Sequence, residues 1–235
     1  CPADGAEVDI GAYHLGGYIL FGRDYQDDAG NWLTRDQFVQ TITGYQNAAL
    51  NDTGIPLLIG SDEEGGTVTR ASRNPNLFDR SFPSPQQLAA ASSGADGAFA
   101  ADARERSLAL LSLGINVNLA PVCDVSTNPG DFIYDRTLGQ DAQATAAYVS
   151  EVASAMRESG IGSVLKHFPG YGNNADTHTG IALDQRSMET FEAHDFLPFE
   201  AGLAAGEGSA AVLVNHNIVS CMDPNLPASL SPEVH

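Results

Sequence analysis

The sequence predicts an α/β fold in which the strands of a parallel sheet alternate with amphipathic helices. Short apolar segments recur along the chain, and longer segments with helical periodicity separate them. Hydrophobic residues make up 43% of the 235 residues, which is typical of a globular domain. Polar residues follow four successive predicted strands, at the position where parallel α/β folds carry their ligand sites.

The first predicted strand covers residues 17–21, and a helix follows at 35–50. Thr34 and Gln37 have the spacing of a capping box, which predicts that the helix begins just after Thr34. Apolar residues that share one face of this helix indicate the side that packs on the core: Phe38, Ile42, Tyr45 and Ala49.

The remaining elements continue the same alternation. Apolar runs predict strands at 56–60, 115–121, 162–166 and 210–214. Helical periodicity predicts helices at 95–113, 140–158 and 187–206, with a break in the last one at Pro198. Because no internal repeat or linker interrupts the series, we expect a single domain over residues 1–235.

The chain is strongly acidic, with a formal net charge of −19 from 30 acidic and 11 basic residues. This charge argues against a surface for nucleic acid or for an anionic membrane. Cys1, Cys123 and Cys221 have neither the spacing of a zinc site nor that of a disulfide framework. Cys1 could be the lipid-modified residue of a lipoprotein or simply the first residue of this sequence, so a cytoplasmic and a secreted location both remain open.

A distinctive loop follows the strand at 162–166. The strand ends in Lys166 and His167, and the next residues are Phe-Pro-Gly-Tyr-Gly. Asp176 and His178 come shortly afterwards, two residues apart. A neighbouring Asp favours the imidazolium form and orients the ring, so His178 is a candidate general acid/base with Asp176 as its partner. A solvated surface turn is the alternative; no spacing favours a metal site here, and no cofactor is expected.

This loop resembles that of glycoside hydrolase family 3, in particular its β-N-acetylglucosaminidase branch. The branch carries Lys-His-Phe-Pro-Gly-His-Gly followed by Asp-Ser-His, so this chain departs from the pattern at Tyr171 and Thr177. The resemblance covers nearly the whole chain and implies a (β/α)8 TIM-barrel. The strands at 17–21 and 210–214 would be its second and sixth. We therefore expect an incomplete barrel of about five strands, with the first and the last two outside this sequence.

The resemblance also implies which residues bind a sugar. The turn that opens with Asp62 is similar to the family's Asp-Gln-Glu-Gly-Gly turn and its following Arg, and Asp135–Gly139 is similar to the Arg-Ser-Phe-Gly element. The implied substrate-binding residues are Asp62, Arg70, Arg136, Lys166 and His167. The residues alone allow two other readings: the acidic turn could cap a helix, and Lys166 could pair with Asp62 or Asp124.

Finally, the resemblance implies a retaining glycoside hydrolase that releases terminal β-linked N-acetylglucosamine from peptidoglycan-type or chitin-type saccharides. His178 would be the acid/base, and the nucleophile would be an Asp after the seventh strand, beyond this sequence. The 235 residues by themselves are then expected to be inactive. A β-glucosidase of the same family and a non-catalytic sugar-binding relic are the alternatives.

Overall fold

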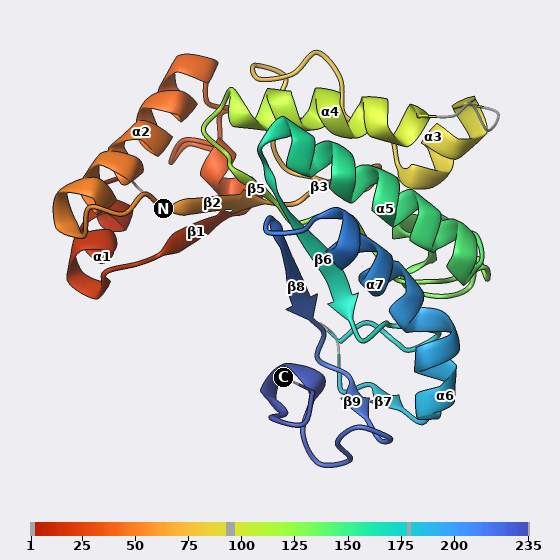
Figure 1. Cartoon of the computed structure of the whole chain (residues 1–235). Coiled ribbons are helices and arrows are strands. Elements are labelled where there is room, and N and C mark those ends of the chain that lie inside the picture. The colour runs from red at the N-terminus through yellow and green to blue at the C-terminus, as the bar shows by residue number, and fades with distance from the viewer. Residues whose placement is uncertain (1–2, 93–96, 178–179, 235) are drawn as a thin grey trace.

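The centre of the fold is a five-stranded parallel sheet, as predicted (Figure 1). The computed structural model describes residues 3–92, 97–177 and 180–234. The strands lie in the order of the chain, so each crossover leads to the next strand, as in a β/α barrel. They are β1 (Gly17–Leu20), β2 (Leu58–Ser61), β5 (Val117–Asn118), β6 (Gly162–Phe168) and β8 (Ala210–Val214). Within the described ranges this sheet does not close into a barrel, because β1 and β8 are its edges.

The long helices lie on the outer side of this sheet (Figure 1). In the figure α4, α5 and α7 lie side by side, and α5 contacts both of its neighbours. The helices are α1 (Ala3–Tyr13), α2 (Arg35–Asp52), α3 (Pro85–Ser92), α4 (Ala98–Leu111), α5 (Ala142–Ser159), α6 (Met188–Thr190) and α7 (Phe196–Ala205). None of the described helices is both long and apolar enough to cross a membrane.

Helix α2 shows how the local sequence sets its own boundaries. The Thr34 side chain accepts a hydrogen bond from the backbone N–H of Gln37, and the Gln37 side chain accepts one from the backbone N–H of Thr34 at 2.9 Å. This confirms the predicted capping box. The four apolar residues predicted to face the core are its buried residues.

Two predicted elements differ from the structure in an informative way. The predicted strand at 115–121 is shorter in the structure, where β5 covers only Val117–Asn118; just before it, the Asn116 side chain accepts a hydrogen bond from the backbone N–H of Ile59 (2.7 Å) and donates one to the Leu57 carbonyl (3.0 Å). The predicted break at Pro198 is wrong, because Pro198 lies inside helix α7; the irregular part of this helical region is a π-helical turn, Phe191–Asp195, which comes before α7. Helices α1 and α3 were not predicted.

Shorter strands and 3₁₀ turns lie between and after the main strands and helices. A hairpin of β3 (Glu63–Gly65) and β4 (Val68–Thr69) follows β2 directly. A parallel pair of β7 (Leu183–Asp184) and β9 (Ile218–Val219) lies beyond β8 in Figure 1. Single 3₁₀ turns occur at Gly22–Tyr25, Tyr134–Arg136 and Ala228–Leu230.

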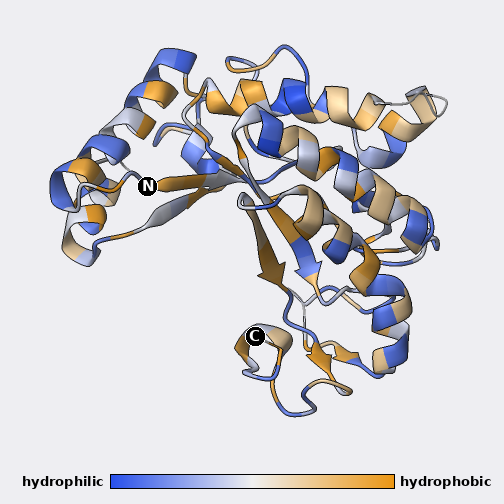
Figure 2. Ribbon diagram, viewed as in Figure 1, coloured by the Kyte–Doolittle hydropathy of each residue, from blue (hydrophilic) through white to orange (hydrophobic). Residues whose placement is uncertain are grey.

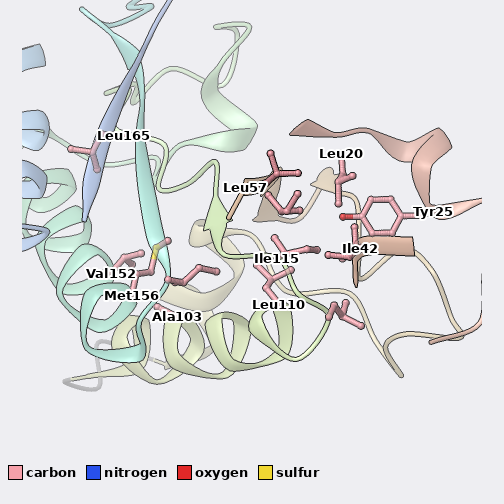
Figure 3. Close-up of a cluster of buried hydrophobic side chains, with 14 of the residues drawn as sticks. Leu20, Tyr25, Ile42, Leu57, Ala103, Leu110, Ile115, Val152, Met156 and Leu165 are labelled. Atoms are coloured by element: carbon pink, nitrogen blue, oxygen red, sulfur yellow. The ribbon is translucent and has the colours of Figure 1, made fainter. Parts of the chain in front are cut away.

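The hydrophobic core lies between the sheet and the helices (Figure 3). Ile59, Ile115 and Leu165 from successive strand regions are fully buried against helix residues such as Leu110 and Met156. This burial is the dominant stabilising contribution for these side chains.

The other face of the sheet is apolar and exposed. Strands β2 and β8 are strongly hydrophobic in Figure 2. Ile19 is 48% exposed, Leu58 62% and Val212 36%, and these side chains line one continuous apolar surface together with Val117 and Val164. Parallel strands are normally buried on both faces, so an exposed apolar face of this kind is the expected property of an unclosed barrel.

A tight contact between α7, α5 and β6 generates a testable prediction. A Cβ at Gly202 would lie 2.7 Å from Val149 Cγ1 and 2.8 Å from Leu165 Cδ1. Gly202→Val is therefore expected to overpack this junction and lower the free energy of unfolding by about 1–3 kcal/mol in urea titrations. Gly11→Val, where nothing lies within 4 Å, is the control; equal effects of both changes would contradict the packing argument.

Candidate functional site

Charged side chains gather where β2, β5 and β6 end. Asp62 follows the last residue of β2, and Glu64 lies two residues later in β3. Residues two apart in an extended chain point to the same side, so Asp62 and Glu64 both face Lys166 of β6, while Glu63 points the other way.

Lys166 is the buried centre of this group. Its Nζ lies 2.6 Å from Asp62 Oδ1 and 2.6 Å from Glu64 Oε1, and its side chain is only 2% exposed. A buried ammonium is costly unless it is paired, and two carboxylates provide that pairing. The structure therefore confirms the predicted pairing of Lys166 with Asp62, and the predicted alternative partner Asp124 is wrong.

Two arginines extend the network on either side of Lys166. Arg70 Nη2 lies 3.7 Å from Asp62 Oδ2. Arg136 binds Glu64 with a fork of two hydrogen bonds, Nε to Oε2 at 2.9 Å and Nη2 to Oε1 at 2.7 Å. Lys166 and these arginines carry three positive charges, which offset the negative charges of Asp62, Glu64 and Asp124.

His167 is held between a donor and an acceptor. Its Nδ1 lies 2.7 Å from Asp124 Oδ2, and its Nε2 lies 3.1 Å from Arg136 Nη2. A guanidinium can only donate, so this contact requires a lone pair on Nε2 and places the ring proton on Nδ1, facing Asp124. The arrangement keeps the imidazole in one orientation at the edge of the cluster.

The pKa of Glu64 reflects this environment. Burial by itself raises the pKa of this carboxyl group, but the Lys166 ammonium and the Arg136 guanidinium outweigh burial and lower it to about 2. Glu64 is thus ionised at neutral pH and holds both cations in place.

Hydrogen bonds of Glu63 and Arg106 fix the β3–β4 hairpin, next to which the charged cluster lies. Glu63 accepts hydrogen bonds from the backbone N–H groups of Arg70 (3.1 Å), Ala71 (2.9 Å) and Ser72 (3.2 Å). Burial raises the pKa of Glu63. Arg106 of α4 donates to the carbonyl oxygens of Glu63 (2.9 Å) and Glu64 (2.6 Å). These contacts fix the backbone from which Asp62, Glu64 and Arg70 extend.

The loop after β6 starts at the same cluster. The Asp124 carboxylate accepts from the backbone N–H of His167 at 3.1 Å and from that of Tyr171 at 2.7 Å. Asp176 lies further along this loop and is partly buried. His178 lies outside the described residues.

The five residues predicted to bind substrate do come together: Asp62, Arg70, Arg136, Lys166 and His167. Their role as substrate ligands stays a prediction, as does the acid/base role of Asp176 and His178. The alternative in which the acidic turn caps a helix is wrong, because a β-hairpin follows Asp62.

Sequence reasoning did not assign Glu64 to the cluster, and it named Asp124 only as a possible partner of Lys166. Glu64 could have been found from its two-residue spacing to Asp62 in an extended segment. Asp124 follows a predicted strand end, but nothing in the local sequence indicates that its partner is His167, 43 residues away.

Known proteins resemble this chain in sequence. Residues 2–234 match the family described as "Glycosyl hydrolase family 3 N terminal domain". A "Beta-hexosaminidase" from Xylella fastidiosa (strain M23) is 32% identical over 222 residues, which are 92% of this chain and 61% of that protein. "Beta-hexosaminidase LpqI" from Mycobacterium tuberculosis is 30% identical over 96% of this chain and 54% of its own length. The chain thus spans less than two thirds of these relatives.

Solved structures resemble its fold. A glycoside hydrolase family 3 β-N-acetylglucosaminidase from Paenibacillus sp. str. FPU-7 superposes with a TM-score of 0.84 at 29% identity, covering 98% of this chain and 42% of that one. Mycobacterium tuberculosis LpqI superposes with a TM-score of 0.81 at 28% identity, covering 99% of this chain and 62% of that one.

The low pKa of Glu64 predicts how stability depends on pH. Its folded-state pKa of about 2 lies below the ordinary value of 4.5, so its stabilising contribution is present above pH 4.5 and is lost as the pH falls towards 2. Glu64→Gln is expected to lower the free energy of unfolding at pH 7 by about 3 kcal/mol. Urea titrations should show that the difference from wild type shrinks below pH 4.5.

Glu105→Gln is the control for this experiment, because Glu105 is 58% exposed and pairs with Arg80 at the surface. Its effect should stay below about 1 kcal/mol at every pH. A difference between wild type and Glu64→Gln that is independent of pH would contradict the role assigned to the Glu64 charge.

Proposed function

The chain belongs to glycosyl hydrolase family 3, and we propose that its protein is a retaining β-N-acetylglucosaminidase. Its substrates would be saccharides of the peptidoglycan or chitin type with a terminal β-linked N-acetylglucosamine. Two relatives named as β-hexosaminidases and a structural neighbour described as a β-N-acetylglucosaminidase support this proposal.

The observation that carries the proposal is the charge-balanced cluster around Lys166. Three cations and three anions compensate one another, so the cluster attracts neither anions nor cations strongly and suits an uncharged ligand. Asp62 can accept hydrogen bonds from vicinal hydroxyls, and Arg70 and Lys166 can donate to sugar oxygens or to an amide carbonyl. These groups are already oriented by their mutual contacts, so binding requires little reorganisation.

The chemical step would be a double displacement. In the first half, His178 would donate a proton to the departing glycosidic oxygen while an Asp carboxylate attacks the anomeric carbon and forms a glycosyl ester. In the second half, His178 would take a proton from water, and the water would replace the ester. Asp176 would orient the imidazole. We propose that the attacking Asp comes from the part of the protein beyond these 235 residues.

The exposed apolar face of the sheet supports the proposal that these 235 residues are one part of a larger barrel. Side chains of β1, β2 and β8 that would line a barrel interior are exposed here, among them Ile19, Leu58 and Val212. Further β/α units would cover these side chains and close the barrel. Residues 1–235, predicted above to form a single domain, would then be one part of that barrel. That the 235 residues alone are inactive stays a prediction.

Hydrolysis by the full-length protein tests the proposal. We expect cleavage of a chromogenic β-N-acetylglucosaminide and little cleavage of the matching β-glucoside. His178→Ala should lower kcat/KM about 10²- to 10⁴-fold for a poor leaving group, and less for a dinitrophenyl leaving group that departs without protonation.

His14→Ala is the matched control, because His14 is an exposed residue that pairs with Asp52. It should retain wild-type rates. If neither substrate is cleaved while N-acetylglucosamine still binds, the protein is a non-catalytic sugar-binding relic. If the β-glucoside is preferred, it is a β-glucosidase.

A further inference from the structure

The two positions at which the loop departs from the family motif touch each other. The Tyr171 hydroxyl lies 2.7 Å from Thr177 Oγ1. These residues stand where the motif has His and Ser, and Thr177 lies between Asp176 and His178 in the sequence. The two departures from the motif thus form a single contact next to the proposed acid/base pair.

Tyr171 is a rigid attachment point for this contact. Its side chain is buried, with only 3% of the residue exposed. Its backbone N–H donates to Asp124 Oδ1 at 2.7 Å. Its ring packs edge-on against His167, with centroids 5.2 Å apart, and against Phe132 at 5.7 Å. The ring and backbone are therefore held by groups that belong to the charged cluster or lie beside it.

The base of the loop is held independently. Arg186 Nη2 donates to the Gly170 carbonyl at 3.0 Å, and the Arg186 guanidinium also binds Asp184 and Asp195. Asn174 Nδ2 donates to the Tyr171 carbonyl at 2.8 Å and to Asp184 at 2.7 Å. The hydroxyl contact between Tyr171 and Thr177 lies further out along the same loop.

We propose that Tyr171 and Thr177 form a positioning pair for the reaction proposed above. The Tyr171 hydroxyl holds the Thr177 side chain and so sets the backbone at Asp176 relative to the His167–Asp124 pair. One carboxylate, Asp124, then orients both His167 in the binding cluster and, through Tyr171, the segment that carries the acid/base machinery. The effect of this pair on catalysis rests on the proposed function. The tether, by which we mean the hydrogen bond between Tyr171 and Thr177, does not depend on that function.

The surroundings of Tyr171 keep its hydroxyl group protonated, as this role requires. Burial raises the pKa of Tyr171 and outweighs the hydrogen bond to Thr177, which lowers it; the nearby charges of Asp124 and Asp176 also raise it. The phenol therefore stays protonated near neutral pH and can donate or accept towards Thr177. The β-branched Thr177 has few side-chain rotamers, so anchoring its hydroxyl also restrains the backbone.

A double-mutant cycle in the full-length protein tests the pair. Tyr171→Phe keeps the ring packing and removes the hydroxyl, and Thr177→Val keeps the shape of the side chain. Each change is expected to lower kcat about 5- to 10-fold for a poor leaving group, with KM changed less than about twofold. The double variant should be no worse than either single variant, because both remove the same hydrogen bond.

Amide hydrogen exchange supplies a readout that does not require activity. Both single variants should exchange faster at residues 173–177 and keep wild-type protection in β6. Tyr13→Phe is the control, because Tyr13 is 73% exposed. Additive losses, unchanged exchange at 173–177, or a KM effect with unchanged kcat would each overturn the positioning role. A wild-type protein that cleaves neither glycoside would instead overturn the proposed function, and the exchange data would still decide whether the tether exists.

Discussion

The candidate site depends on the burial of one cation. Lys166 is 2% exposed and needs compensating charge, which Asp62 and Glu64 provide at 2.6 Å each. Each carboxylate then retains capacity for a second cation, so Arg70 and Arg136 complete an alternating chain of charges. Because Lys166, Asp62 and Glu64 each contact two opposite charges, removing one member would weaken the compensation of its neighbours. The charged side chains of the cluster consequently hold one another in fixed orientations.

Polar contacts that are themselves buried maintain that geometry. Asn118 accepts from the backbone N–H of Glu63 and donates to its carbonyl, both at 3.0 Å, which ties the end of β5 to the start of the hairpin. Arg106 binds the same hairpin from the helical layer. The positions of Asp62 and Glu64 therefore depend on the sheet and on α4 together. A site supported by sheet and helix is more precise than one supported by a loop alone.

Asp124 connects the charged cluster around Lys166 to the loop after β6. Its two oxygens contact different parts of the chain, His167 on one side and the Tyr171 backbone on the other. The loop itself is closed at its base by Arg186, whose guanidinium lies 4.3 Å from the centre of the Phe191 ring in the π-helical turn. The irregular turn before Pro198 thus has a place in the site, because it supplies Asp195 and Phe191 to the residue that holds the loop.

The sequence by itself determined the parts of this protein that depend on neighbours in the chain. Helix α2, its cap and its buried face follow from spacings within one segment, and the alternation of elements follows from local periodicity. The order of strands was predictable because successive parallel strands joined by crossovers of one hand leave few alternatives. The motif around Lys166 and His167 identified the edge of the sheet that carries the candidate site.

Only the tertiary structure decided which charges meet. Lys166 and Asp62 are 104 residues apart, and Arg136 and Glu64 are 72 residues apart. Whether Asp124 would pair with Lys166 or with His167 depends on the direction in which the side chains leave adjacent strands, to within a few ångströms. No local pattern encodes such distances, because ion pairing acts through space and is set by the register of the sheet.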